Sequence, residues 1–162
     1  MSNFQKIVEF HKCFGLEYNE TPQVDVVERK PDLVKLRSDL INEEVSEYTE
    51  AVEQNNFIEI IDALTDILYV VYGAGASYGI DMDKAFDLVH KSNMSKLCTS
   101  EEEARLTVEH YRSDDRYDSP AYRKGENGDY WVVYNESSGK ILKSINYKPV
   151  KFDSILPDLS SA

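Results

Sequence analysis

The 162-residue sequence has few cysteines, and their positions exclude two kinds of site. Cys13 and Cys98 are far apart, and the sequence contains no Cys-x-x-Cys motif or Cys/His cluster. Structural zinc sites and disulfide frameworks both depend on such clusters. We therefore predict neither a zinc site nor a disulfide, and we expect both cysteines to be ordinary buried thiols.

The sequence also lacks a segment that could cross a membrane. Its longest uncharged apolar stretch, residues 67–80, is interrupted by glycines and is too short to span a bilayer. The N-terminus lacks the basic and then apolar pattern of a secretory signal. We therefore expect a soluble, cytoplasmic protein that has no membrane partner.

Positive charge is scarce, because 18 Lys and Arg residues oppose 30 Asp and Glu residues and give a formal charge of −12. Proteins that bind nucleic acids neutralise phosphates with clustered Lys and Arg, so a nucleic-acid partner is not expected. An acidic protein can still bind a small polyphosphate when divalent cations lie between its carboxylates and the ligand. The placement of the acids is therefore the informative feature.

The hydrophobic periodicity predicts an all-α fold with a small appendage. A hydrophobic content of 41% is enough for one core, and we find no internal repeat. Apolar residues at helical spacing predict four helices over residues 2–14, 32–54, 57–78 and 82–97. A short fifth helix is expected from the cap Ser100, with Glu103 completing a capping box, to about residue 112.

After residue 112 the periodicity falls to two, which is typical of strands. Residues 129–134 and 140–147 predict a β-hairpin around a turn that contains Gly139, and the chain beyond Pro149 is expected to be irregular. We therefore predict a four-to-five-helix domain over residues 1–112. Residues 113–162 would form a C-terminal extension that is not an independent domain.

Three acids follow the apolar face of the second predicted helix. At about 100° per residue, Glu44 continues the stripe that Leu36 and Leu40 begin, and Glu47 lies about 60° from Glu44. Glu43 precedes them directly. A solvated acidic face is an equally good interpretation of these three residues alone.

The third predicted helix, over residues 57–78, is apolar nearly all round and yet carries acids. Asp62 and Asp66 lie one turn apart among Ile, Leu and Val, and Glu59 precedes Asp62 by three residues. Unpaired buried carboxylates are costly, so acids on facing helices should share cations. Mg²⁺ is the preferred candidate, since proteins hold it with a few carboxylates and the phosphates of a substrate.

The pattern Glu43-Glu44-x-x-Glu47, followed by Asp62-Ala-Leu-Thr-Asp66 and an apolar run, resembles the all-α nucleoside triphosphate pyrophosphohydrolase superfamily. That superfamily includes MazG, the dimeric dUTPases and the phosphoribosyl-ATP pyrophosphohydrolases, and the resemblance covers about residues 1–98. Its motif is Glu-x-x-Glu on one helix and Glu-x-x-Asp on the next, binding Mg²⁺ in a helical bundle that dimerisation completes.

The resemblance implies a set of metal ligands. Glu44 and Glu47 match the first pair, and we match Asp66 to the family's aspartate, with Asp62 one turn earlier in place of the usual Glu. Glu59-x-x-Asp62 satisfies the same spacing and is the alternative. We expect Mg²⁺ as the cofactor, with Mn²⁺ as a possible replacement.

The resemblance also implies contacts with a nucleotide. Lys91-Ser-Asn93-Met-Ser-Lys96 looks like the family's Asn-x-x-Lys element near the phosphates and sugar, although a solvated lysine is the ordinary interpretation. His11 and Phe14 are candidates for base contact or for simple core packing. Arg37, seven residues before Glu44, would contact phosphate or pair with an acid.

The reaction implied is hydrolysis of a nucleoside triphosphate to the monophosphate and pyrophosphate. Glu43 or one of the ligands, such as Glu47, would orient or deprotonate the attacking water, and Lys96 would neutralise a phosphate oxygen. Phosphoribosyl-ATP is an alternative substrate. We also expect a homodimer or a dimer of dimers, because one small bundle cannot cover a helix that is apolar all round.

A di-iron carboxylate protein and a non-enzymatic acidic scaffold are the competing classes. A di-iron carboxylate bundle requires two Glu-x-x-His motifs, and none of the three histidines follows a glutamate at that spacing. That class is excluded. A non-enzymatic acidic scaffold, which uses the hairpin to bind a partner, remains open and predicts neither metal dependence nor turnover.

Overall fold

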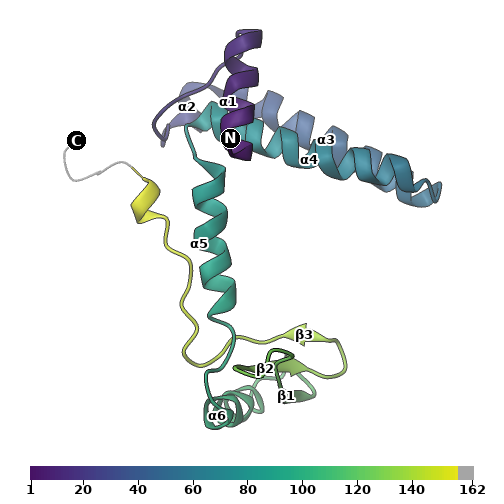
Figure 1. Ribbon diagram of the computed structural model, residues 1–162, viewed down its shortest axis with the longest axis vertical. Coiled ribbons are helices and arrows are strands. Elements are labelled where there is room, and N and C mark those ends of the chain that lie inside the picture. Colours follow the sequence, from purple (N-terminus) through teal and green to yellow (C-terminus); the bar gives the residue numbers. More distant parts are fainter. Residues whose placement is uncertain (157–162) are drawn as a thin grey trace. The chain divides into compact units, whose positions relative to one another are not determined.

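The computed structural model describes residues 1–156, which fall into two compact units. The first unit contains Met1–Phe86 and the segment that begins at Phe152, and the second contains Asp87–Lys151. The helices are α1 (Asn3–Phe14), α2 (Val26–Arg29), α3 (Pro31–Glu53), α4 (Phe57–Tyr78), α5 (Met82–Met94) and α6 (Glu101–Tyr111) (Figure 1). None of the helices in this described part is long and apolar enough to cross a membrane.

The longest helices, α3 and α4, lie side by side as a hairpin (Figure 1). The link is short because Asn55 adopts a φ of 54°, a left-handed conformation that asparagine tolerates better than most residues. Asn56 then caps α4 by accepting a hydrogen bond from the backbone N–H of Glu59. Ala51 and Ala63 are buried on these two helices, and residues this small let packed helices approach closely.

The first unit is completed by α1 and the loop that follows it. Ser2 forms a capping box with Gln5, and Gly15 ends the helix with a φ of 66°, so the helix predicted over residues 2–14 is confirmed. The loop is fixed to the end of α4 by hydrogen bonds from the backbone N–H of Asn19 to the Ala76 carbonyl and of Gln23 to the Tyr78 carbonyl.

Helix boundaries differ from the prediction at three places. The loop before α3 contains the short helix α2, which the sequence analysis missed. Helix α3 begins at Pro31, so Asp32 lies in its first turn instead of capping it. Helix α5 ends at Met94, not near residue 97, because the chain turns to let Cys98 exchange backbone hydrogen bonds with Trp131.

The predicted hairpin is wrong in its extent. The second unit contains a three-stranded antiparallel sheet in the order β1 (Pro120–Lys124), β2 (Trp131–Asn135) and β3 (Lys140–Ile141). The turn at Gly139 is confirmed, but β3 has only two residues, and β1 was not predicted. Helix α6 packs on this sheet around a core of Cys98, Ala104, Val108, Val133 and Leu142.

The two cysteines lie in different surroundings. Cys98 is fully buried in the core of the second unit, and burial raises the pKa of its thiol. Cys13 is exposed on α1, so the expectation that both thiols are buried is wrong for this residue. Cys13 lies on the solvent side of an amphipathic helix whose buried residues are Ile7 and His11.

Glu103 is a buried carboxylate that holds the second unit together. It accepts hydrogen bonds from the backbone N–H and the hydroxyl of Thr99, at 3.0 and 2.8 Å, and from the hydroxyl of Ser144. Burial alone would raise the pKa of Glu103, but these hydrogen bonds outweigh burial and place the pKa below its ordinary value. The charged form is therefore favoured in the folded state.

We expect Glu103→Gln to lower the free energy of unfolding by about 1–3 kcal/mol at neutral pH, because an amide cannot accept all of these bonds. Because the folded pKa is lowered, the advantage of the parent is present above the unfolded pKa and is lost as the pH falls through the folded value. Denaturant melts between pH 7 and pH 3 would measure it. Glu102→Gln, at an exposed position, is the control, and equal losses in both variants would contradict this role for Glu103.

Candidate active site

The acids predicted on α3 and α4 all affect the pKa of one carboxyl group, that of Glu44. The pKa of Glu44 is raised, first by burial and then by the negative charges of Glu47, Asp66, Glu43 and Asp62. Each of the five acids that the sequence analysis selected therefore contributes to one electrostatic cluster. These charges come from both helices of the hairpin.

Glu44 also has an unsatisfied oxygen. Its Oε2 atom is buried and has no hydrogen-bond partner. Buried carboxylate oxygens are normally paired, because an unpaired one costs several times the net value of a hydrogen bond. A buried, unpartnered oxygen in a cluster of like charges fits the binding of a cation.

The carboxylates are not gathered into a ready-made cage. Among the described residues, no group of three or more His, Cys, Asp or Glu side chains is arranged to hold a metal ion. Like charges repel one another when no cation lies between them, and Glu47 and Asp62 are exposed and free to adjust. The ligand set of Glu44, Glu47, Asp62 and Asp66 stays a prediction.

Arg37 is the second unsatisfied group on α3. It is 7% exposed, its Nε atom is buried without a partner, and it makes no ion pair or hydrogen bond within the described chain. Burial lowers the pKa of this guanidinium, while the nearby Tyr78 and Glu17 act in the opposite direction. The suggested direct pairing of Arg37 with an acid is therefore not seen, and its donors are available to a ligand.

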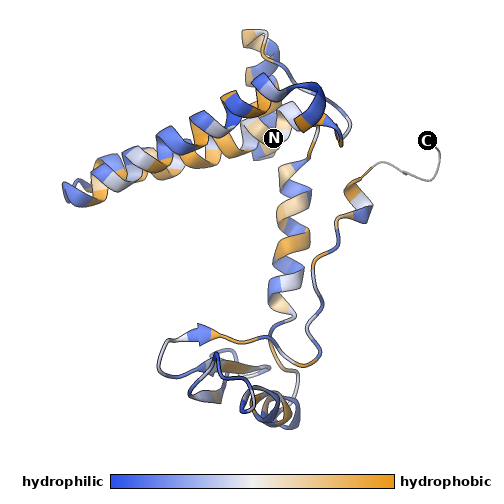
Figure 2. Cartoon of the chain, turned by 180° about the vertical axis from the view of Figure 1, so that it is seen from behind, coloured by the Kyte–Doolittle hydropathy of each residue, from blue (hydrophilic) through white to orange (hydrophobic). Residues whose placement is uncertain are grey.

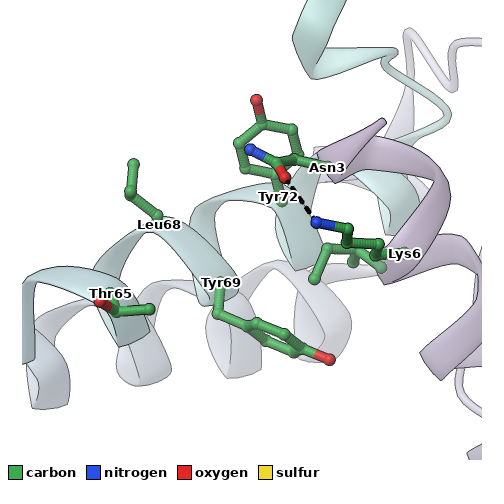
Figure 3. Close-up of a pocket in the computed structure, with 7 residues that line it drawn as sticks. Asn3, Lys6, Thr65, Leu68, Tyr69 and Tyr72 are labelled. Atoms are coloured by element: carbon green, nitrogen blue, oxygen red, sulfur yellow. Dashed lines mark hydrogen bonds between the residues drawn. The ribbon is translucent and has the colours of Figure 1, made fainter. Parts of the chain in front are cut away.

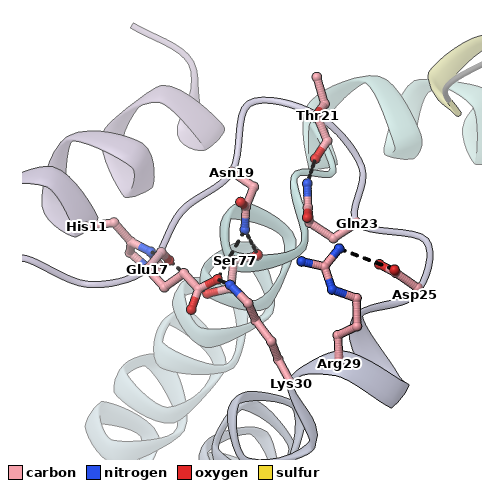
Figure 4. Close-up of polar contacts among 9 residues, drawn as sticks. All are labelled: His11, Glu17, Asn19, Thr21, Gln23, Asp25, Arg29, Lys30 and Ser77. Atoms are coloured by element: carbon pink, nitrogen blue, oxygen red, sulfur yellow. Dashed lines mark hydrogen bonds and ion pairs between the residues drawn. The ribbon is translucent and has the colours of Figure 1, made fainter.

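His11 presents an acceptor next to Arg37. Its Nδ1 lies 2.7 Å from the carbonyl oxygen of Glu17, which only accepts, so Nδ1 carries the proton (Figure 4). The pKa of His11 is lowered, chiefly by burial and also by the charge of Arg37. The ring is therefore neutral near pH 7, and its Nε2 is a bare acceptor.

Gly73 on α4 shows that the two side chains meet at one point. A Cβ atom built on Gly73 would lie 3.4 Å from Nη1 of Arg37 and 3.5 Å from Nε2 of His11. A charged donor and a neutral acceptor therefore lie against the same turn of α4. The hydroxyl of Ser77 and the ion pair between Lys30 and Glu17 hold the loop beside them (Figure 4).

Aromatic side chains lie between α1 and the acidic face of α4. Phe14 is exposed and stacks on Phe10 at 4.3 Å between ring centroids, and Phe10 packs edge-on against Tyr69 at 5.5 Å. Tyr69 follows Asp66 by three residues and so shares its face. Phe14 was predicted from the sequence as a site residue, whereas Phe10 and Tyr69 were not, although this spacing was the available signal for Tyr69.

Tyr69 also borders a mostly apolar cavity of about 280 Å³ (Figure 3). The cavity lies between α1 and α4, and its polar groups include the Lys6 ammonium, which donates to the side chain of Asn3. Its remaining walls are Ile7, Thr65, Leu68 and Tyr72. The cavity is thus available to an apolar or aromatic group.

The remaining predicted contacts belong to the second unit. Lys91 and Asn93 are exposed on the last turns of α5, and Lys96 lies in the turn that follows the helix. No ion pair to Lys91 or Lys96 is formed among residues 1–156. Their role toward a nucleotide stays a prediction.

Comparison with known proteins identifies the family to which this chain belongs. Residues 7–93 match the family model described as phosphoribosyl-ATP pyrophosphohydrolase, a range that contains the five acids, His11, Arg37 and Asn93. The chain is also 31% identical to the uncharacterized protein L479 of Acanthamoeba polyphaga mimivirus, over 96% of each chain. The second match extends through most of the region that follows residue 93.

Proposed function

We propose that this chain cleaves a nucleoside triphosphate with Mg²⁺. The reason is that it belongs to the phosphoribosyl-ATP pyrophosphohydrolase family of MazG-like, all-α nucleoside triphosphate pyrophosphohydrolases. The family supports a pyrophosphohydrolase activity on a nucleotide-like substrate. The products would be a nucleoside monophosphate and pyrophosphate.

One observation carries this proposal. In the described residues, the buried side-chain atoms without a partner are Oε2 of Glu44 and Nε of Arg37, which have opposite charge. They are seven residues apart on α3, so they share a face and lie roughly 10 Å apart along the helix. A ligand that brings cation-bound phosphates to Glu44 and a polar acceptor to Arg37 satisfies both.

The residues fit a divalent cation, which members of this family typically use. Glu44, Glu47, Asp62 and Asp66 would hold it, since carboxylate oxygens are the ligands that Mg²⁺ prefers. When bound, it would offset the charge of the phosphates and lower the pKa of a water. Glu43, which adjoins Glu44, would orient or deprotonate that water.

At the other end of the site, Arg37 and His11 would bind the nucleoside. Arg37 donates and Nε2 of His11 accepts, so together they suit a nucleobase edge that presents an acceptor beside a donor. Phe14, stacked on Phe10, is placed to cover a base. Stacking of this kind is tolerant of base identity, so the polar pair would provide the discrimination.

A nucleotide panel tests the proposal. The protein is incubated with canonical and modified nucleoside triphosphates and with phosphoribosyl-ATP, with Mg²⁺ or with excess EDTA, and pyrophosphate is assayed. We expect release from at least one compound with Mg²⁺ and none with EDTA. Turnover of phosphoribosyl-ATP alone would favour that alternative substrate. No release from any compound would favour a non-enzymatic acidic interaction protein, and release in EDTA would contradict a metal mechanism.

The apolar residues of α4 that remain exposed support a homo-oligomer. Ile61, Leu64 and Leu68 recur at helical spacing and form a stripe along α4, and each is at least 47% exposed. Hydrophobic and hydrophilic residues alternate along the hairpin of long helices (Figure 2). The stripe lies about half a helical turn from Asp66, so a second copy could cover it without covering the acids. An exposed stripe of this length is typical of a helix that packs against another subunit.

We therefore expect the parent to scatter light as a dimer or tetramer, well above the monomer mass of 18.6 kDa. Leu64→Glu should shift the population toward monomer, because it places a charge in the apolar contact. Val27→Glu, at an exposed apolar position on α2 outside the stripe, should leave the mass unchanged. A monomeric parent at micromolar concentration, or equal effects of both variants, would contradict this interface.

A further inference from the structure

Gly73 leaves a small gap in the first unit, between a hydrogen-bond donor and an acceptor. It is a buried residue in the interior of α4, where alanine is the better helix former. A Cβ atom here would lie at ordinary contact distance from Nη1 of Arg37 and Nε2 of His11, at 3.4 and 3.5 Å. Apart from its neighbours along α4, no other residue in the described part of the chain comes within 4 Å of that point. The gap therefore has room for a methyl-sized group.

Close packing does not explain this glycine. Gly75, two residues further along α4, has no room for a side chain, because a Cβ there would overlap Cγ of Met82 and lie 3.1 Å from the carbonyl oxygen of Ile80. Alanine at Gly73 would displace no neighbouring atom. A glycine that weakens its helix and avoids no clash fits a position where an atom of a ligand enters.

The two polar atoms that border the gap have no partner for this purpose within residues 1–156. Arg37 is 7% exposed, and its Nε atom is buried without a hydrogen bond. Nδ1 of His11 donates to the carbonyl oxygen of Glu17, which leaves Nε2 as a bare acceptor (Figure 4). The lone pair of Nε2 repels an anion, whereas a neutral group with an acceptor beside a donor satisfies both side chains.

The gap lies two helical turns from the acids on both helices of the hairpin. Arg37 precedes Glu44 by seven residues and Gly73 follows Asp66 by seven, so each pair shares a helix face and is separated by roughly 10 Å. Because α3 and α4 run antiparallel, side by side, the two pairs lie opposite each other (Figure 1). This arrangement suits a nucleotide whose phosphates lie at the acids and whose base reaches the gap.

We propose that Gly73 is a specificity-determining residue, whose missing side chain admits the edge of a neutral nucleobase between Arg37 and His11. This role rests on the proposed function. An acceptor of the base receives a hydrogen bond from Nη1 of Arg37, and the adjacent N–H of the base donates to Nε2 of His11. A base whose N–H is methylated is rejected, because the buried Nε2 is then left unpaired.

Two glycine variants of the full chain test this role, and their expected effects are opposite. Gly73→Ala should raise the melting temperature in EDTA by about 1–4 °C, since alanine favours the helix and meets no clash. Its methyl group takes the place of the base edge, so the KM for the best nucleotide of the panel should rise by about 10-fold or more. Gly75→Ala should melt below the parent and leave KM unchanged.

A double variant checks that the gap acts through Arg37. Gly73→Ala combined with Arg37→Met should have a KM close to that of Arg37→Met alone, because both substitutions remove the same contact with the base. Independent increases that multiply would show that the methyl group acts elsewhere, and they would overturn the proposal.

The ¹⁵N NMR signal of Nε2 of His11 reports on the gap without any turnover. Ribo- and deoxyribonucleoside 5′-monophosphates are titrated into the parent and into Gly73→Ala at about pH 8, where the ring is neutral, with inorganic phosphate as the anion control. At least one monophosphate should shift the Nε2 signal of the parent, and the same compound should shift it much less in Gly73→Ala. Inorganic phosphate should shift it in neither protein.

The failures can be told apart. An unchanged KM in Gly73→Ala would overturn the proposal, and a lowered melting temperature with it would mean that a structural water fills the gap. An Nε2 signal that responds to inorganic phosphate, or to none of the monophosphates, would exclude a base at the gap. A parent without turnover would refute the proposed function, whereas an Nε2 response that Gly73→Ala abolishes would still establish the gap as a nucleobase site.

Discussion

Neutralising the acidic cluster should abolish catalysis without weakening the fold. We expect Glu47→Gln and Asp66→Asn each to lower kcat/KM by about 100-fold or more, because each removes a ligand charge from the metal site. In EDTA, both variants should melt at or above the temperature of the parent. The reason is that Glu44 is already destabilised by burial and by the charges of Glu47 and Asp66, so that removing one charge relieves repulsion.

A loss of turnover without a loss of melting temperature distinguishes a cation site from ordinary structural acids. An acid that pairs with Arg or Lys loses stability when neutralised, because its partner is left alone. Asp25→Asn provides the matched control, since Asp25 pairs with Arg29 on the surface and should change neither melting nor turnover by much. If Glu47→Gln and Asp66→Asn melt well below the parent and keep near-normal turnover, our assignment of the metal site is wrong.

Arg37→Met should weaken substrate binding by about 10- to 100-fold, the range expected for a lost hydrogen bond to a charged group. The loss should appear mainly in KM, because Arg37 would contact the nucleoside and not the reacting phosphorus. The variant should fold at least as stably as the parent, since methionine fills the space and removes a buried charge that has no ion-pair partner in the described chain. Steady-state kinetics and melts in EDTA would measure both effects.

Two controls sharpen this experiment. Arg29→Met removes an exposed arginine that pairs with Asp25, and it should leave KM unchanged. His11→Gln keeps polar atoms but loses the fixed Nε2 acceptor. It should therefore change the selectivity between two nucleotides that differ in their base, measured as the ratio of their kcat/KM values, more than it changes the kcat for either nucleotide. A large loss of stability in Arg37→Met with an unchanged KM would mean that Arg37 is structural.

The parts of the fold that the sequence predicted well have strong local signals. Helix α4 spans residues 57–78 as predicted, because Asn56 caps its start and Gly79 ends it in a left-handed conformation with a φ of 74°. A Cβ at Gly79 would lie 1.9 Å from the Thr21 carbonyl oxygen, so only glycine fits this close approach. The Asn56 cap and the Gly79 stop can be recognised in a sequence before any tertiary contact is known, whereas the contact with Thr21 cannot.

The parts that were missed depend on distant partners. Strand β1 pairs with β2 through a register that joins Tyr122 to Val133, and its last two residues, Arg123 and Lys124, are exposed and charged. Edge strands of this kind carry a weak alternating pattern. The extent of the sheet and the end of α5 depend on pairing between distant segments, so they could not be predicted from the periodicity of the sequence.

The same distinction applies to the candidate site. The spacing of Glu44 and Glu47 was enough to predict a shared face, and the pKa of Glu44 is raised by burial and by the charges of acids on both helices. No pattern in the sequence could show that Arg37 is buried without a partner or that His11 presents Nε2 as an acceptor. Both follow from the packing of α1 and its loop against α4.

The most direct test of the central claim is product analysis by ³¹P NMR with the best substrate of the nucleotide panel. The account predicts that the triphosphate resonances are replaced by those of a monophosphate and pyrophosphate when Mg²⁺ is present. It also predicts that EDTA, or the substitution Asp66→Asn, stops the change. A nucleoside diphosphate with inorganic phosphate as products, or the same products at the same rate in EDTA, would contradict it.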